Sequence, residues 1–362
     1  MTFEFLRVKE EDAIRVDADQ LRELISALFQ KLGQSKEDAD ITADILVLSD
    51  LFGVDSHGVS HNIKGWYIRA FSEGRLNPKP REEIVQETPG TALIDGGGGL
   101  GHAVAYRGMK LAIEKARQVG VGIVSIRNSS HFGMAGYYPY MAVREDMIGI
   151  AMTSGGGAIV LPTFGAKPMY GTNPLSIGAP AGKHPAFLLD MATSVVAAGK
   201  LQIASLLGVP IPEGWALDEN LEPTTDPVRA LKAHHLLPLG GDQAHGSHKG
   251  FGLGLAVQIL CGILSGHGYT PAIAPGTMTH FLMAIDIAAI RPADEFKAMM
   301  DDMIEAIHNS PTQPGHEHIY IAGEIEWGNY NERSRNGIPL HKEVVAWLNE
   351  IAAEVGFEEI SS

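Results

Sequence analysis

Residues 91–126 read TALIDGGGGLGHAVAYRGMKLAIEKARQVGVGIVSI, and this stretch indicates the fold class. Residues 91–95 and 121–126 are short runs rich in apolar and β-branched residues, as is typical of strands. Between them, apolar residues from about 103 to 118 recur at helical spacing. The stretch therefore predicts a strand, a helix and a second strand, which is an α/β unit.

Residues 96–101 match the G-x-G-x-x-G pattern of dinucleotide-binding Rossmann folds and lie between the strand and the helix, as that motif requires. The next strand, however, ends in Arg127-Asn128 and lacks the acidic residue that binds a ribose hydroxyl. Four consecutive glycines also match many patterns by chance. The residues alone leave both a Rossmann site and a glycine-rich turn open.

Two helices precede this unit. Asp17 is a candidate N-cap for a helix that ends near Gly33, and Ser35 begins a second helix that ends near Gly53. After the unit, residues 148–189 form short β-rich runs separated by Gly and Pro, which predicts a mixed or largely antiparallel sheet. A helix over about 194–207 follows.

Residues 208–250 are rich in Pro, Gly and His, which predicts a long and mostly irregular excursion. The apolar run 251–266 is too short and too interrupted for a membrane span and predicts a buried helix. Helices are expected again around 295–307 and 341–355.

The composition excludes several classes of protein. The chain has 362 residues, 28 Lys and Arg against 43 Asp and Glu, and a net charge of −15, which disfavours binding to nucleic acid or to anionic membranes. Its one cysteine, Cys261, allows neither a disulfide framework nor a cysteine-based zinc site. The first residues show no signal-peptide pattern, so we expect a cytoplasmic protein.

Three histidines, His57, His131 and His248, lie in segments rich in Gly and Ser, where an imidazole can reach a ligand and exchange protons near neutral pH. A structural role is the alternative for each. Asp190 follows an apolar run and precedes a predicted helix, so it either orients a histidine or caps that helix. The pairs His316-x-His318 and His234-His235 have no carboxylate or cysteine at a recurrent spacing, and no metal site is expected.

Taken in chain order, a set of motifs resembles the type-2 malate/L-lactate dehydrogenase family over about residues 15–357. The motifs are DSHGV (55–59), NSSHFG (128–133), GTNP (171–174), DMATS (190–194), IPEGWA (211–216), PTTDP (223–227), LLPLG (236–240), KGFG (249–252), GE (323–324) and GIPL (337–340). The resemblance implies a seven-stranded, mixed and mostly antiparallel sheet without a Rossmann domain. The glycine run 96–101 then becomes a turn.

The same resemblance implies two domains and a homodimer. Residues 81–289, with the excursion 208–250, would form the cofactor-binding sheet domain. Residues 1–80 together with 290–362 would form a helical domain.

The implied reaction is reversible hydride transfer between NAD or NADP, with NAD favoured, and C2 of a 2-hydroxy or 2-oxo acid. His57 matches the family's acid/base histidine, while Asp190 and His131 match its partners in the active site. The residues expected to contact the cofactor are Ser154, Tyr170, Gly171, Thr172, Asn173, Pro174, Leu175, His248, Lys249, Gly323 and Glu324.

Two positions depart from the family pattern. Many relatives carry arginines where this chain has Phe52 and His61, so we expect Ser56, His61 and Lys64 to bind the substrate. Residues 242–247 also resemble an insertion. Two alternatives stay open: a reductase of a cyclic imino acid or a sugar-derived keto acid on the same fold, and a non-catalytic cofactor-binding protein.

Overall fold

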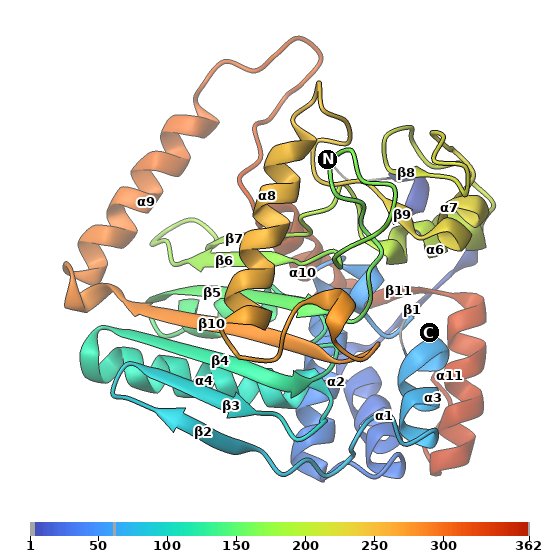
Figure 1. The fold of residues 1–362 in the computed structure, drawn as a ribbon, viewed down its shortest axis with the longest axis horizontal. Helices are drawn as coiled ribbons and strands as arrows, with labels where there is room; N and C mark the ends of the chain where they lie inside the picture. The colour runs from blue at the N-terminus through green and yellow to red at the C-terminus, as the bar shows by residue number, and fades with distance from the viewer. Residues whose placement is uncertain (1–3, 61–62, 361–362) are drawn as a thin grey trace.

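The computed structural model describes residues 4–60 and 63–360 as a layered α/β structure around one large sheet (Figure 1). The strands are β1 (Ala13–Val16), β2 (Glu83–Glu87), β3 (Thr91–Asp95), β4 (Val121–Ser129), β5 (Met147–Gly155), β6 (Leu175–Ala179), β7 (Phe187–Met191), β8 (Ala216–Leu217), β9 (His235–Leu236), β10 (Met278–Asp286) and β11 (Ile338–His341). The helices are α1 (Ala18–Lys31), α2 (Lys36–Leu51), α3 (Ile68–Ser72), α4 (Gly101–Val119), α5 (Tyr137–Val143), α6 (Ala198–Leu207), α7 (Pro227–Ala233), α8 (Ser247–Gln258), α9 (Ala293–His308), α10 (Glu324–Asn336) and α11 (Lys342–Val355).

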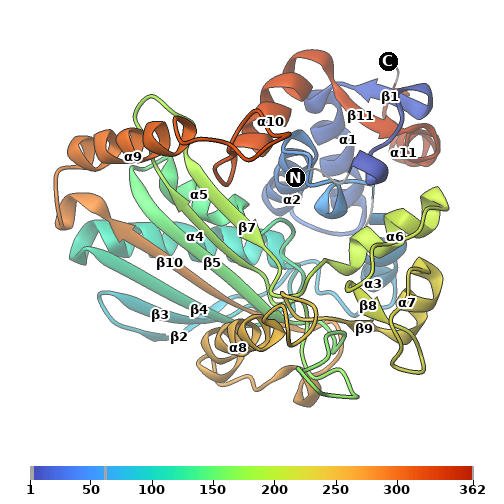
Figure 2. The same ribbon diagram turned by 90° about the horizontal axis from the view of Figure 1, so that it is seen from above.

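The large sheet has seven strands in the order β2-β3-β4-β10-β5-β6-β7. Strands β3 and β4 run parallel and are connected by α4, whereas the other neighbouring pairs are antiparallel. This confirms the mixed, mostly antiparallel sheet and the strand–helix–strand unit. Helices α4 and α5 cover one face, and α8 with a π-helical turn at Ile259–Ile263 covers the other (Figure 2).

The glycine run after β3 is a turn tied to the end of β4. The N–H of Gly96 donates to the Arg127 carbonyl at 2.8 Å, and that of Gly98 donates to the Asn128 carbonyl at 2.9 Å. A Cβ on Gly101, the first residue of α4, would lie 2.2 Å from the carbonyl oxygen of Ser130. Glycine is required there because the helix start meets the backbone that leads to His131.

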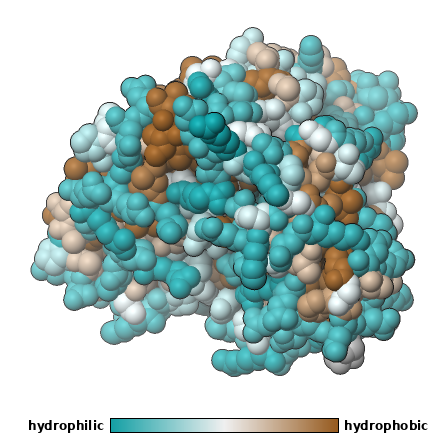
Figure 3. All heavy atoms as spheres, turned by 90° about the horizontal axis from the view of Figure 1, so that it is seen from below, coloured by the Kyte–Doolittle hydropathy of each residue, from teal (hydrophilic) through white to brown (hydrophobic). Residues whose placement is uncertain are grey.

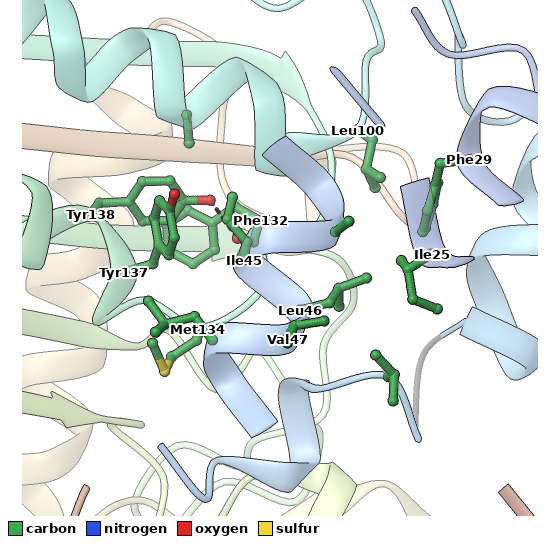
Figure 4. Close-up of a cluster of buried hydrophobic side chains, with 14 of the residues drawn as sticks. Ile25, Phe29, Ile45, Leu46, Val47, Leu100, Phe132, Met134, Tyr137 and Tyr138 are labelled. Carbon is green, nitrogen blue, oxygen red and sulfur yellow. Dashed lines mark hydrogen bonds between the residues drawn. The ribbon is translucent and has the colours of Figure 1, made fainter. Parts of the chain in front are cut away.

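Both chain ends build the helical part. Strand β1 pairs with β11, and the predicted caps are present: Asp17 accepts the N–H groups of Asp19 and Gln20, and Ser35 accepts that of Asp38. Helix α2 is buried along most of its length. Figure 4 shows it between an aromatic group near α5 and the side chains of α1. This packing fixes the C-terminal end of α2, which leads to His57.

Four features differ from the sequence-based expectations or extend them. Strand β10, in the middle of the sheet, was not predicted, and neither was α10. The excursion 208–250 contains α7 and the short β8–β9 pair. Helix α9 lies beside β6 and β7, where Asp301 accepts the backbone N–H groups of Gly182, Lys183 and His184. The domain boundaries near residues 80 and 290 stay a prediction.

The apolar run 251–266 is helical, but the prediction that it is buried was wrong. Cys261 is fully buried, whereas Leu255, Ile259 and Ile263 are 40%, 56% and 51% exposed. One side of this helical segment packs on the sheet and the other side is open, because no described element covers it. Among the described helices, none combines the length and apolar character needed to cross a bilayer. Seen from below, the surface is mainly hydrophilic with separate apolar patches (Figure 3).

Candidate active site

A cavity of about 290 Å³ lies between the end of α2, the β4–α5 loop, the residues from β7 to α6, and α10. This volume is near the lower end of the range for small-molecule sites, about 300 Å³. The lining residues that carry chemistry or shape are Phe52, Ser56, His57, Gly133, Gly136, Thr172, Pro174, Asp190, Ser194, Lys200 and Glu326. The cavity therefore gathers side chains from segments that are far apart in the sequence.

His57 ends a 3₁₀ turn, Asp55–His57, that follows α2. Its Nδ1 lies 2.9 Å from the Ser56 hydroxyl. Below the turn, the buried Asp50 accepts the N–H of Val59 at 2.8 Å. A Cβ on Gly58 would lie 1.8 Å from Asp50 Oδ1, so the backbone packs directly on this carboxyl. These contacts hold the His57 imidazole at the cavity wall.

His131 lies against His57, with ring centroids 5.6 Å apart and planes inclined by 18°. Its Nδ1 is 2.7 Å from the Tyr67 hydroxyl and 3.3 Å from the N–H of Gly133. Because both neighbours are donors, we assign Nδ1 as the acceptor and place the proton of the neutral ring on Nε2. Within the described residues, His57 lines the cavity and His131 does not, so His131 is a supporting partner in this geometry.

Two further histidines near this pair are buried and neutral. Burial lowers the pKa of His102 to about 3, with His57 and His280 as further causes. Burial also lowers the pKa of His280 to about 3, although a backbone contact to Ser130 partly opposes it. His280 bridges the hydroxyls of Thr153 and Ser129 at 2.8 and 3.0 Å. Neither ring exchanges protons near neutral pH, so both are structural.

Asp190 lies on β7 and lines the cavity. Many protein atoms surround its carboxyl group, but water can reach this group through the cavity. The N–H of Gly136, which precedes α5, donates to Oδ2 at 2.6 Å. Burial raises the pKa of Asp190 to about 6, the Gly136 N–H lowers it, and nearby Glu326 raises it. The alternative that Asp190 caps a helix was wrong, because α6 begins after Ala197.

Lys200 lines the same cavity and was missed in the sequence analysis. Burial lowers the pKa of its ammonium group, and Glu326 raises it. A signal did exist, since Lys200 is the one charged residue in the otherwise uncharged segment 194–208. A cation inside an apolar helix of this kind is a candidate for binding an anionic ligand.

The turn at residues 171–174 is at the cavity, but its residues play different parts. Thr172 and Pro174 line the cavity. Asn173 is buried and donates to the Gly254 carbonyl at 2.9 Å, so it joins the turn to α8. Tyr170 is fully buried behind the turn, and Leu175 begins β6. Gly171 leaves no room for a side chain, because a Cβ would lie 2.9 Å from the Gly155 carbonyl oxygen.

The other residues predicted to contact cofactor are not among those lining the cavity. Ser154 is buried and bonds to Gln258 at 3.3 Å. His248 and Lys249 are exposed in the first turn of α8. Glu324, which follows Gly323 at the start of α10, lies against two histidines. These contacts stay predictions.

The predicted substrate-binding residues also separate. Ser56 lies at the cavity, whereas His61 lies outside the described residues. The Lys64 ammonium group lies 6.0 Å from the ring centre of Trp347 on α11, and Lys64 is not among the residues lining the cavity. In this position its charge interacts with an aromatic ring.

Phe52, which was expected to depart from the family pattern, has aromatic surroundings. Its ring centroid lies 4.9 Å from that of Trp327, 5.6 Å from that of Tyr330 and 6.1 Å from that of Tyr140. Phe52 is 1% exposed, and it is one of the residues that line the cavity. The site therefore has an apolar wall at this position.

The geometry defines a class of protein. An imidazole, a carboxyl group with a raised pKa and a lysine converge on one cavity beside a glycine-containing loop and a turn, on a mixed sheet without a Rossmann core. This arrangement suits proton-coupled chemistry on a small anionic molecule.

Comparison with known proteins gives the family. The family model for malate/L-lactate dehydrogenase matches residues 16–349. Malate dehydrogenase from Pyrococcus abyssi is 44% identical over 353 residues, which are 96% of each chain. L-sulfolactate dehydrogenase from Methanocaldococcus jannaschii is 40% identical over 92% of this chain and 95% of that protein. The crystal structure of malate dehydrogenase from Entamoeba histolytica is 34% identical, with a TM-score of 0.92 over 96% of this chain and 99% of that one.

The chain therefore belongs to the malate/L-lactate dehydrogenase family, as its motifs indicated, and it is an oxidoreductase. The family's dehydrogenases use nicotinamide cofactors. Residues 96–101 form the turn that the resemblance implied, so the alternative of a Rossmann motif, which the residues alone left open, is excluded.

Proposed function

We propose that the protein interconverts a 2-hydroxy acid and a 2-oxo acid of the malate type by hydride transfer to and from a nicotinamide cofactor. One observation carries the proposal: His57, Asp190 and Lys200 line a single cavity. An acid/base group, a carboxyl group and a cation are what such a reaction needs, since one proton moves with each hydride and the substrate is anionic.

We assign His57 to the transfer of the proton to and from the substrate oxygen. A bound nicotinamide would supply the hydride that C2 gains when the 2-oxo acid is reduced, and the His57 imidazolium gives the carbonyl oxygen its proton. The C=O π bond is replaced by a C–H and an O–H bond, and His57 becomes neutral. Oxidation of the hydroxy acid reverses each step. His131 supports the His57 ring, and Asp190 stabilises positive charge in the cavity when it is ionised.

We assign Lys200 to the binding of the substrate carboxylate. Lys64 lies beside Trp347, so Lys200 is the better candidate for the missing arginine charge. Malate and sulfolactate, which the names of the relatives give as substrates, both carry a second acidic group beyond the 2-hydroxy acid. A small acid with two negative groups is therefore the first substrate to test.

The site fits a nicotinamide cofactor. Gly133 and Gly136 line the cavity with backbone atoms only. A Cβ would lie 2.7 Å from His102 Nε2 at Gly133 and 3.0 Å from Asp190 Oδ2 at Gly136, so this part of the wall takes no side chain. Thr172 and Pro174 form the facing turn. We propose that Tyr170–Leu175, His248, Lys249, Gly323, Glu324 and Ser154 bind or support the cofactor, and that NAD is used in preference to NADP.

A cytoplasmic homodimer is also part of this proposal. The open apolar side of the α8 segment supports self-association, because Leu255, Ile259 and Ile263 follow one another at four-residue spacing and form a continuous exposed apolar face. Sedimentation of the wild-type protein and of Ile259→Glu tests this. A dimer in the first and a monomer in the second is expected, and a monomeric wild type contradicts it.

The function is tested by following NADH and NADPH oxidation with oxaloacetate, sulfopyruvate, pyruvate and 2-oxoglutarate. We expect turnover with a four-carbon or sulfonated oxo acid, loss of turnover in His57→Ala, and retention in His316→Ala, a matched exposed histidine. If both reduced cofactors raise the melting temperature without turnover of any acid, the substrate assignment is wrong. If neither cofactor binds, the proposal as a whole is wrong.

The aromatic wall at Phe52 favours one second candidate, reduction of a cyclic imino acid. A relative of this kind, delta1-piperideine-2-carboxylate reductase from Pseudomonas syringae, is 26% identical with a TM-score of 0.82. An apolar wall suits a ring better than it suits a second carboxylate. Adding delta1-piperideine-2-carboxylate to the panel separates the two, since a higher kcat/KM for the imine than for every oxo acid selects the second candidate.

A further inference from the structure

Outside the active-site cavity, three side chains converge where α9 ends and α10 begins. His308 is the last residue of α9, Glu324 is the first of α10, and His318 lies in the loop between them. One nitrogen of each imidazole and one carboxylate oxygen all lie within 4.8 Å of one another. Figure 2 shows the end of α9 beside the segment that leads into α10.

One side of the Glu324 carboxylate is hydrogen-bonded and the other is not. Oε2 accepts the N–H of Ile321 at 2.7 Å and shares a hydrogen bond of 3.4 Å with His318 Nε2. His308 Nε2 lies 2.7 Å from Glu324 Oε1, yet it is buried and has no hydrogen-bond partner, because the two atoms are not aligned for one. A ring-nitrogen lone pair and a carboxylate oxygen repel at this distance unless a positive charge lies between them.

The two nitrogen–oxygen separations, 2.7 and 3.4 Å, are within the range for neighbouring ligand atoms of one cation. Two ligand atoms about 2.05 Å from a tetrahedral metal ion lie about 3.3 Å apart, and smaller ligand angles bring them closer. Two imidazoles and one carboxylate are a donor set that Zn²⁺ accepts, with a fourth position left for water. His184 is next to the cluster, 5.9 Å from His308 between ring centroids, and its buried Nε2 also has no hydrogen-bond partner.

We propose that His308, His318 and Glu324 bind a divalent transition-metal ion of the zinc type, and that this ion clamps the loop 309–323. The loop is connected to the active-site sheet, because the N–H of Leu188 on β7 donates to the Ala322 carbonyl at 3.0 Å. Trp327 on α10 donates to the Ala186 carbonyl, also at 3.0 Å. The ion is a structural clamp and takes no part in hydride transfer. With Glu324 bound to the ion, this residue would support the cofactor only through the position of the loop, and the rest of the proposed function is unchanged.

The test uses untagged, EDTA-treated full-length protein titrated with ZnCl₂ by calorimetry. Wild type is expected to bind one ion per chain, and His318→Ala to bind it at least about 100-fold more weakly. His316→Ala is the matched control, since His316 is two residues away in the same loop and outside the cluster. The control variant is expected to bind zinc like the wild type.

Two further measurements keep the result specific. Co²⁺ is expected to give visible d–d absorption bands that disappear in His318→Ala. Chymotrypsin is expected to cleave more slowly after Tyr320, which is 61% exposed, when zinc is present. No saturable zinc binding overturns the proposal. So does binding that survives in His318→Ala but is lost in His57→Ala, because the ion would then lie in the cavity.

Discussion

The rings of His57 and His131 stack at 5.6 Å, and the two residues come from the end of α2 and the loop after β4. The stack gives the two histidines different roles. His57 faces the cavity, while His131 uses Nδ1 for Tyr67 and Gly133. A pair of like groups this close favours at most one positive charge, because two imidazolium ions would repel.

The first prediction follows from this pair. His57→Gln is expected to lower kcat by about 10²–10⁴, the usual contribution of a positioned acid/base group. His131→Gln is expected to cost less. The double variant should be about as slow as His57→Gln alone, because residues that act as a unit are not additive. Steady-state kinetics and melting temperatures of the three variants measure this, and a larger loss in His131→Gln would exchange the two roles.

The second prediction concerns pH and Asp190. Its pKa is raised to about 6 in the folded protein, against an ordinary value of 3.8. Between these values the folded state binds more protons than the unfolded state, so stability falls as pH rises from about 4 to about 6. In Asp190→Asn this contribution is absent. Without cofactor, the melting temperature of the variant relative to wild type should therefore rise across that window and stay constant above it. A flat difference would contradict the raised pKa.

The third prediction separates two lysines. Lys200→Met is expected to raise KM for the oxo acid by about 10-fold to 100-fold, because a cation that binds a carboxylate is lost from the cavity. Lys64→Met removes the same charge beside Trp347 and should leave KM unchanged. Both variants keep the length of the side chain. An effect on KM in Lys64→Met alone would restore the original assignment of Lys64.

The fourth prediction concerns Asp50, on which the His57 turn packs. Complete burial and the nearby Asp55 raise its pKa well above 3.8, although the Val59 N–H and Arg333 oppose this. The raised pKa favours the neutral form of this side chain, and Asp50→Asn is close to that form in shape and charge.

Asp50→Asn is thus expected to keep stability within about 1 kcal/mol of wild type. Asp50→Ala leaves the buried N–H of Val59 unpaired and should lower the free energy of unfolding by about 1–3 kcal/mol. It should also lower kcat, because the His57 turn packs on this side chain. Urea unfolding and kinetics of the two variants measure the difference. Equal losses in both would show that the negative charge matters.

Local signals predicted much of the fold. The caps Asp17 and Ser35 marked α1 and α2 because a side chain that accepts backbone N–H groups does so within a few residues. The β3–α4–β4 unit was predicted for the same reason, since its periodicities are local. Family motifs added the number of strands in the sheet and the roles of His57 and Asp190, which no local pattern distinguishes from structural residues.

Long-range pairing was harder to predict. Strand β10 bonds to β4 and β5, which lie more than a hundred residues earlier, and its run MTHFLMAID does not alternate cleanly because both faces are covered. The lysine that binds the substrate was predicted at Lys64 and is now proposed to be Lys200, for a similar reason. Lys64 is near His57 in sequence, but the backbone directs it to α11, while Lys200 reaches the cavity from a separate helix.

The pairing of β1 with β11 has a consequence for synthesis of the chain. Residues 13–16 leave the ribosome more than three hundred residues before residues 338–341, so this contact cannot form until β11 has been synthesised. Closing a loop of this length costs only a few kcal/mol, because the entropy of closure grows with the logarithm of length. The pairing is therefore delayed by the order of synthesis and not by the cost of closing the loop. A nascent chain that stops before β11 lacks the strand that pairs with β1. A chain that stops before β11 accordingly has an unpaired strand edge at β1, and such edges make incomplete chains prone to aggregation.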